Sequence, residues 1–259
     1  MNIYHMSYIR SFLGETMAML YFRGCNFSCQ ECLRKRDEGN IYAEETEYIR
    51  WDLEGIFSFL EEIGPARVYL EGYEPTMDPD LPEIAHRVSS LPAQVTLMTN
   101  GSLLTDGYAR ELIRSGVRDF IIGVKAFDPG SHLDYTGESR DKVLDGVRAL
   151  ASIDDLDFSM QVETVLLPGV NDPGNVVDLA RFLSGLDPSI SLFIEPFIPN
   201  PESRYREPNR EELIRSVAGA MEHLYLVSYH PLHSEIESMR RSPRRAVFVD
   251  VRPEGERKG

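Results

Sequence analysis

The sequence is poor in cysteine and contains no long apolar run. Its 259 residues include three cysteines and a single tryptophan. No stretch approaches the roughly 20 apolar residues that a membrane-spanning helix needs, and the first residues lack a long apolar core followed by small residues at a cleavage site. We therefore expect neither a membrane-spanning helix nor a secretory leader, and we predict a soluble cytoplasmic protein with no membrane partner.

Basic residues are also scarce. Lysine and arginine together number 27 against 42 aspartates and glutamates, so the formal net charge at pH 7 is -15. A field of this sign repels polyanions, and nucleic acid would bind only at a local basic patch strong enough to overcome it. The charge balance therefore predicts no nucleic-acid partner.

The three cysteines, Cys25, Cys29 and Cys32, lie within one short segment. An odd number of cysteines in one loop argues against a disulfide framework, which distributes pairs along a secreted chain. The spacing C-x3-C-x2-C lets three soft thiolates converge on an iron-sulfur cluster and leaves one iron open for another ligand. A structural zinc site and three unligated thiols are the alternatives, although zinc usually takes four protein ligands and no fourth ligand stands at suitable spacing nearby.

Short β-rich runs alternate with helical patterns along most of the chain. Repeated strand-helix units with right-handed crossovers build a parallel sheet covered by helices. Six units are too few for a closed eight-stranded barrel, so we predict an α/β fold: an incomplete (β/α)6 TIM-like barrel with a curved parallel sheet, or alternatively an open doubly wound sheet. The expected strands are residues 17–22, 67–70, 94–98, 120–125, 158–167 and 191–197, and the expected helices are residues 52–63, 81–91, 106–115, 140–152, 173–183 and 210–223.

No strong linker divides the chain. We predict one partial-barrel domain over residues 1–223, because the strand-helix alternation continues to that point. Residues 224–259 are expected to form a C-terminal extension, with an apolar run at 246–251 and a charged tail.

Residues suited to ligand binding follow four successive expected strands. The cysteines follow the first strand, Gly72 and Glu74 the second, and Thr99 and Asn100 the third, while Lys125 ends the fourth. Both candidate architectures bind ligands at the carboxyl ends of the strands, where the connecting loops converge. The sequence therefore predicts that these residues contribute to one site.

At these residues the chain resembles the radical S-adenosylmethionine (SAM) superfamily, in particular its small members, the pyruvate formate-lyase activating enzymes. The cysteine motif is similar to the motif of the superfamily, and residues 72–76, G-Y-E-P-T, resemble its G-G-E-P-[TL] segment. Residues 99–101 resemble its T-N-G turn, and Lys125 with the segment 132–137, H-L-D-Y-T-G, resembles the pattern D-x-K…H-x-x-L-T-G. The resemblance extends from about residue 18 to about residue 208.

This resemblance implies a [4Fe-4S] cluster held by Cys25, Cys29 and Cys32, whose open iron chelates the amino and carboxylate groups of SAM. One-electron reduction by a donor such as flavodoxin or ferredoxin cleaves SAM to methionine and a 5'-deoxyadenosyl radical in such enzymes. That radical takes a hydrogen atom from the substrate.

The resemblance also assigns the cofactor contacts. Glu74 would accept hydrogen bonds from the SAM amino group, and Lys125 would place a positive charge near the SAM carboxylate or ribose. Gly72, Thr99 and Asn100 would approach SAM from the second and third strands.

Several residues depart from the family pattern. Glu31 stands before the third cysteine, where the family commonly has an aromatic residue. Gly123 replaces an acidic residue two positions before the lysine, and Ile198 replaces a histidine after the sixth strand. Met98 stands where an acidic residue is frequent, and Glu163 where a basic residue is common. We therefore expect the contacts to the SAM carboxylate to differ from those of the family, and we leave the substrate open.

Glu163 and Glu195 occupy strand positions that can face the lumen. Together they would form an acidic wall that recognises a cationic or hydrogen-bond-donating substrate, and Arg204 is a further candidate substrate contact. Alternatively, one or both glutamates pair with Lys125 or Arg204, because buried charges normally find partners. Four histidines show no ligand spacing and are expected to be surface or packing residues: His86, His223, His230 and His233.

The sequence thus predicts a radical SAM oxidoreductase that acts on a protein or peptide, as a glycyl-radical-enzyme activase does. All three cysteines belong to one motif, so none remains for an auxiliary cluster. The alternatives are a radical SAM enzyme that acts on a small metabolite and, in a different class, a non-catalytic zinc-binding protein.

Overall fold

The computed structural model describes residues 3–10, 14–32, 53–235 and 249–250. They form one nine-stranded sheet in the order β8-β7-β6-β5-β4-β3-β2-β1-β9. Neighbours from β2 to β8 are parallel, whereas β1 is antiparallel to β2 and to β9. The strands are β1 (Ile3–Arg10), β2 (Thr16–Phe22), β3 (Arg67–Gly72), β4 (Gln94–Thr99), β5 (Val117–Val124), β6 (Ser159–Leu166), β7 (Ser191–Pro196), β8 (Val227–Tyr229) and β9 (Val249–Asp250).

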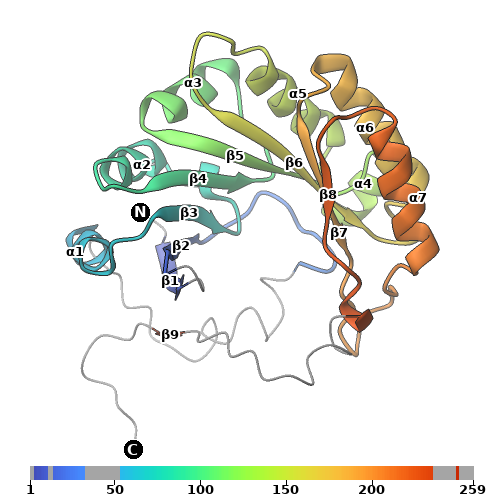
Figure 1. Cartoon of the computed structure of the whole chain (residues 1–259), viewed down its shortest axis with the longest axis horizontal. Helices are drawn as coiled ribbons and strands as arrows, with labels where there is room; N and C mark the ends of the chain where they lie inside the picture. Colours follow the sequence, from blue (N-terminus) through green and yellow to red (C-terminus); the bar gives the residue numbers. More distant parts are fainter. Residues whose placement is uncertain (1–2, 11–13, 33–52, 236–248, 251–259) are drawn as a thin grey trace, which may run out of the picture.

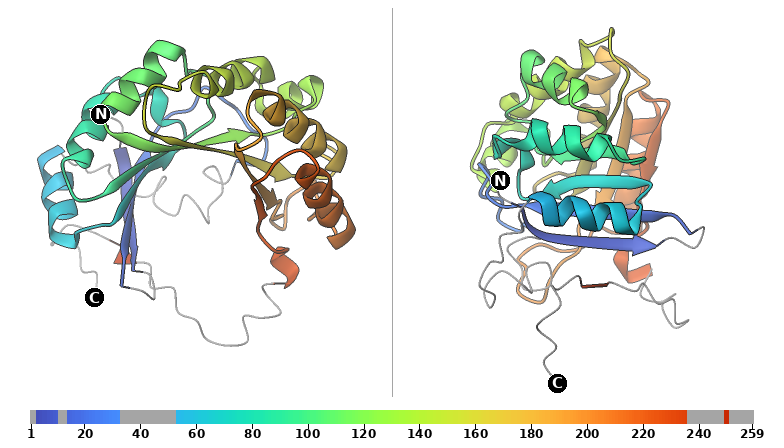
Figure 2. Two further views of the ribbon diagram at one scale, coloured as in Figure 1. Left: turned by 45° about the horizontal axis from the view of Figure 1, so that its top comes forward. Right: turned by 90° about the vertical axis from the view of Figure 1, so that its left-hand side faces the viewer.

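The helices cover the convex face of this curved sheet (Figure 1). They are α1 (Leu53–Ile63), α2 (Leu81–Ser89), α3 (Asp106–Arg114), α4 (Pro129–Thr136), α5 (Arg140–Ala151), α6 (Pro173–Leu186) and α7 (Arg210–Met221). Figure 2 shows the sheet as an arch whose two ends lie apart. The prediction of an incomplete (β/α) barrel with a curved, mostly parallel sheet is therefore confirmed.

Period-two alternation along the strands decides which side chains face the helices and which face the hollow of the arch. In β6, Val162, Thr164 and Leu166 are buried beneath the helices, and Glu163 and Val165 between them are only partly covered. The pattern repeats in β7, where buried leucine and isoleucine flank partly covered residues. Because successive side chains of a strand point to opposite faces, this alternation presents Glu163 and its neighbours to the concave side.

All six expected strands are present, and the elements that were not expected include β1, α4 and β8. β1 shows little alternation of buried and exposed positions, so its pattern does not mark a strand. α4 has only eight residues and begins with Pro129 and Gly130, which are typical of turns. β8 has three residues and pairs with β7, so the segment after residue 223 adds a strand to the sheet.

Some expectations lie outside the described residues. These are the first residue of the helix expected at 52–63, the charged tail, and the apolar run at 246–251 except for its two residues in β9. Within the described ranges, every helix is too short or too polar to span a bilayer.

Candidate active site

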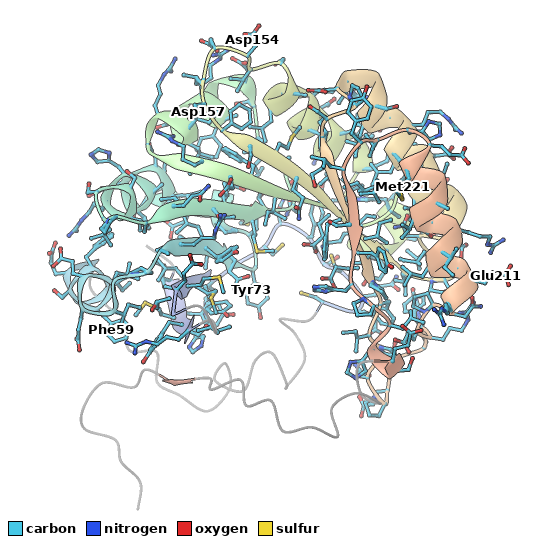
Figure 3. The ribbon with its side chains drawn as sticks, in the orientation of Figure 1. Phe59, Tyr73, Asp154, Asp157, Glu211 and Met221 are labelled. Carbon is cyan, nitrogen blue, oxygen red and sulfur yellow. The ribbon has the colours of Figure 1, made fainter. Side chains whose placement is uncertain are left out.

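A cavity of about 300 Å³ opens on the concave side, at the carboxyl ends of the strands. Figure 3 shows Tyr73, one of its lining residues, on this side of the sheet. The cavity brings together nine of the eleven predicted site residues, and only Glu74 and Arg204 are not among its lining side chains. The nine are Cys25, Cys29, Cys32, Gly72, Thr99, Asn100, Lys125, Glu163 and Glu195.

The cysteine loop follows β2 and is held by backbone hydrogen bonds from two sides. On one side Glu74 N donates to Gly24 O at 3.0 Å. On the other, Ser28 N donates to Thr136 O at 2.7 Å and Gln30 N to Tyr135 O at 3.0 Å. These bonds tie the loop to the segment after β3 and to the last turn of α4, so the positions of the cysteines depend on both.

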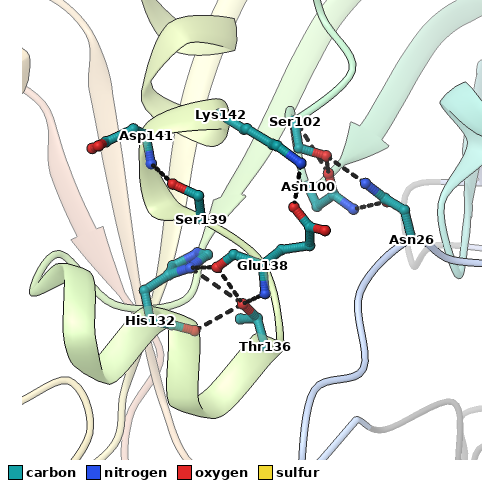
Figure 4. A network of polar contacts seen from close by, with 9 residues as sticks. All are labelled: Asn26, Asn100, Ser102, His132, Thr136, Glu138, Ser139, Asp141 and Lys142. Atoms are coloured by element: carbon teal, nitrogen blue, oxygen red, sulfur yellow. Dashed lines mark hydrogen bonds and ion pairs between the residues drawn. The ribbon is translucent and has the colours of Figure 1, made fainter.

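A ring of side-chain hydrogen bonds also holds this loop to the turn after β4 (Figure 4). Asn100 Nδ2 donates to Asn26 Oδ1 at 2.9 Å, and Asn26 Nδ2 donates to Ser102 Oγ at 2.8 Å. Ser102 Oγ closes the ring by donating to Asn100 Oδ1 at 2.6 Å. Asn100 Nδ2 also lies 3.9 Å from Cys25 Sγ. Asn100 therefore positions the cysteine loop as well as lining the cavity.

A second network in Figure 4 fixes the end of α4. Thr136 Oγ1 donates to His132 O at 2.7 Å, and the Glu138 backbone N donates to Thr136 Oγ1 at 3.1 Å. His132 is fully buried, and its Nδ1 lies 3.1 Å from Glu138 O. Burial lowers the pKa of this histidine, which favours the neutral ring. The network supports the carbonyl groups that hold the cysteine loop.

Glu74 lies behind the cavity wall and is fully buried. Its Oε1 accepts hydrogen bonds from Thr76 Oγ1 and Thr99 Oγ1, both at 2.5 Å, and from Thr76 N at 3.2 Å. Its Oε2 accepts from Asn100 N at 2.7 Å. Burial raises the pKa of Glu74, and these hydrogen bonds oppose the rise. The carboxylate thus links the segment after β3 to the end of β4, and its contact with the SAM amino group stays a prediction.

Gly72 ends β3 directly against β2. Its φ of +118° lies in a region that favours glycine, and a Cβ at this position would lie 2.5 Å from Phe22 N and 2.6 Å from Phe22 O. A side chain here would therefore push the end of β3 away from the start of the cysteine loop.

Replacing Gly72 with alanine should lower the free energy of unfolding by about 2 to 4 kcal/mol, because strain at a positive φ adds to a clash with backbone atoms. Thermal or urea unfolding measures the loss. The matched control is Gly174→Ala in α6, where a Cβ would meet nothing within 4 Å. That control should leave stability unchanged or raise it by up to about 1 kcal/mol. Equal stability of the two variants would contradict the expected clash.

Arg204 lies in the loop after β7 and faces the cysteine loop from outside the cavity. Its guanidinium donates to Tyr205 Oη at 2.7 Å and to Gln30 Oε1. Tyr205 Oη also donates to Gln30 Oε1, at 2.6 Å. Arg204 therefore connects two loops, and its role as a substrate contact stays a prediction.

His230 is exposed and packs against an aromatic ring, as expected, and it also reaches a predicted site residue. Its Nδ1 lies 2.8 Å from Glu195 Oε1, and its ring packs edge-on against Phe193 with centroids 4.8 Å apart. The contact arises because β8 pairs with β7 and ends beside Glu195. No ligand-like spacing in the sequence marks His230, since its partner lies on another strand.

The donor set fits a cluster better than a zinc ion. In the part of the chain that the structure describes, no three His, Cys, Asp or Glu side chains converge on one metal-ion position. A structural zinc ion usually takes four protein ligands, whereas three thiolates can hold a cubane and leave one iron open. Burial raises the pKa of the Cys25 thiol to about 11, so iron binding would have to favour the thiolate.

Comparison with known proteins agrees with the cysteine motif. The family profile described as Radical SAM superfamily matches residues 19–183. A Methanocaldococcus jannaschii protein named as a glycyl-radical enzyme activating enzyme is 27% identical over 218 residues, which are 83% of this chain and 81% of that protein.

Two further similarities show the range of relatives. A GTP 3',8-cyclase of Aquifex aeolicus is 26% identical over 173 residues, which are 66% of this chain and 53% of the cyclase. The crystal structure of a domain of pyruvate-formate lyase-activating enzyme from Bacteroides vulgatus superposes with a TM-score of 0.56 at 20% identity, over 63% of this chain and 98% of that domain. At this identity the superposition shows the fold alone.

Proposed function

Because this chain belongs to the radical SAM superfamily, whose members use a [4Fe-4S] cluster and SAM, we propose that it takes a hydrogen atom from a protein or peptide, as a glycyl-radical-enzyme activase does. The observation that carries this proposal is the M. jannaschii relative, which matches about four fifths of both chains. The arch of the sheet also supports it, because the cavity lies on the concave side of a barrel whose ends do not meet.

The residues at the cavity have different roles in this proposal. When bound, the cluster and SAM supply a 5'-deoxyadenosyl radical, methionine being released after one electron enters from a donor such as flavodoxin or ferredoxin. Cys25, Cys29 and Cys32 would hold the cluster, and Asn100 and Lys125, which line the same cavity, would contact SAM. The substrate would lose a hydrogen atom to this radical, which would give 5'-deoxyadenosine and a substrate radical.

A small-molecule substrate is the second candidate, because GTP 3',8-cyclases also match this chain.

The deciding experiment is anaerobic reconstitution with iron and sulfide, followed by incubation with SAM and dithionite. We expect 5'-deoxyadenosine formation to rise when a glycyl-radical enzyme of the same organism is added, and deuterium in its glycine to enter the product. Stimulation by GTP instead, with deuterium transfer from GTP, would move the assignment to the second candidate. A protein that binds only zinc and forms no 5'-deoxyadenosine would contradict both.

A further inference from the structure

Two glutamates from neighbouring strands meet on the wall of the cavity. Glu163 of β6 is paired in register with Phe193 of β7, and Val165 is paired with Glu195. The glutamates are therefore two positions apart on adjacent parallel strands and share the concave face. Both line the cavity and are only partly exposed.

Among the described residues, Glu195 has His230 as its partner, and neither Lys125 nor Arg204 forms an ion pair with Glu163 or Glu195. Lys125 folds back over Gly123, where a Cβ would lie 3.0 Å from Lys125 Nζ. Within the described residues Lys125 makes no ion pair or hydrogen bond with Glu163 or Glu195, and Arg204 is engaged by Gln30 and Tyr205. The alternative of a buried network with Lys125 or Arg204 is therefore not formed by the described residues.

Among the described residues, the charged side chains that line the cavity are mainly acidic. Its lining includes Glu31, Glu71, Glu163 and Glu195 but a single basic side chain among the described residues, Lys125. Burial raises the pKa of Glu195, the charge on Glu163 raises it further, and His230 and Lys125 oppose the rise. Carboxylates in such a partly desolvated place are stabilised by a bound cation, above all by a guanidinium or ammonium that donates several hydrogen bonds.

We propose that Glu163 and Glu195 form a subsite for a cationic group of the substrate, a guanidinium or ammonium, and that His230 is a positioning residue that orients Glu195. The subsite rests on the proposed function, because the bound cation would hold the substrate beside the cofactor. His230 is suited to this role because its own ring is fixed by Phe193 and its backbone N donates to Ile194 O at 3.2 Å.

The test uses the full-length reconstituted enzyme with SAM bound. The probes are an acetylated and amidated Gly-Arg-Gly peptide, the same peptide with uncharged citrulline in place of arginine, and methylguanidinium as a free cation. Anaerobic calorimetry should show the arginine peptide binding about tenfold more tightly than the citrulline peptide, a ratio typical of one charge-assisted contact. If the arginine peptide binds more tightly than methylguanidinium, the cationic group belongs to a protein or peptide substrate. If methylguanidinium binds more tightly, the cationic group belongs to a small molecule.

The double variant Glu163→Gln/Glu195→Gln should abolish the preference for the charged peptide. Its matched control is Asp154→Asn/Asp157→Asn, which removes two exposed carboxylates from the turn before β6 (Figure 3) and should keep the preference. The proposal is overturned if the double variant retains the preference, if the wild-type protein shows none, or if the affinity for SAM falls as much as the affinity for the peptide. Absence of 5'-deoxyadenosine in the wild-type protein would instead count against the proposed function.

His230 is tested by two substitutions with opposite properties. His230→Phe keeps a ring beside Phe193 but removes the polar contact to Glu195, whereas His230→Gln keeps a hydrogen-bond donor and removes the ring. We expect the preference for the arginine peptide to fall about threefold or more in the first variant and to be largely retained in the second. The opposite order would show a packing role and overturn the assignment of His230.

Discussion

Replacing Cys29 with alanine should abolish binding of the iron-sulfur cluster and formation of 5'-deoxyadenosine. The loss should exceed about 100-fold, since removing even a residue that only orients a metal ligand costs up to that factor. Cys29 is only partly exposed and packs against both the main core and the small buried cluster that contains Tyr135 and Phe197. The visible absorption of the reconstituted protein, its iron content and its EPR spectrum measure the result.

Alanine at Cys25 or Cys32 should have the same effect, because each thiolate of a cubane binds a different iron. Met221→Ala is the control, since it removes an exposed sulfur-containing side chain from α7 (Figure 3). Circular dichroism separates cluster loss from unfolding. A Cys29→Ala protein that still carried a cluster and cleaved SAM at the wild-type rate would rule out the assigned ligand set.

Replacing Glu74 with glutamine should destabilise the protein by about 2 to 4 kcal/mol and weaken SAM binding. Oε1 accepts three hydrogen bonds and Oε2 accepts one from Asn100 N. A glutamine with its amide nitrogen at the Oε2 position would face the Asn100 N-H with another donor, and the reverse orientation would lose three acceptor contacts. Because these groups are buried, unsatisfied donors bear their full desolvation cost.

Urea unfolding and the SAM dissociation constant measure the two effects of Glu74→Gln. Thr99→Val removes one of the four hydrogen bonds to Glu74 and also the acceptor of the Gly101 backbone N at 3.0 Å, so it should cost about 2 kcal/mol. Glu62→Gln, an exposed change of the same chemistry in α1, should be neutral. A stable Glu74→Gln protein with unchanged affinity for SAM would show that the buried carboxylate does not hold the cavity together.

Much of the site follows from local features of the sequence. The three cysteines stand in one short loop, so their spacing alone predicts that they hold a cluster. Thr99, Asn100 and Lys125 line the cavity because each stands at the end of a strand, and these ends meet at one edge of a parallel sheet. Glu163 and Glu195 could be placed toward the lumen because the side chains of a strand alternate with period two.

Contacts between distant segments could not be predicted in this way. Asn26 and Ser102 match no motif, yet their side chains join the cysteine loop to the turn after β4. Arg204 is predicted as a substrate contact, and its bonds to Gln30 and Tyr205 were not foreseen, because they depend on the loop after β7 running beside the cysteine loop. Such pairings depend on how loops from different strands pack, and no period or spacing within one segment encodes that packing.

The sequence by itself determined the chemistry and the class of fold, because cluster ligands, strand ends and alternation are local patterns. Tertiary structure alone decided the roles of three charged side chains. Glu74 became a buried acceptor for groups at the end of β4, and Glu195 acquired His230 as a partner through the pairing of β7 with β8. Lys125 turned back over Gly123 and, among the described residues, forms no ion pair with Glu163 or Glu195. Charges act over a few ångströms in space, and only the folded chain sets those distances.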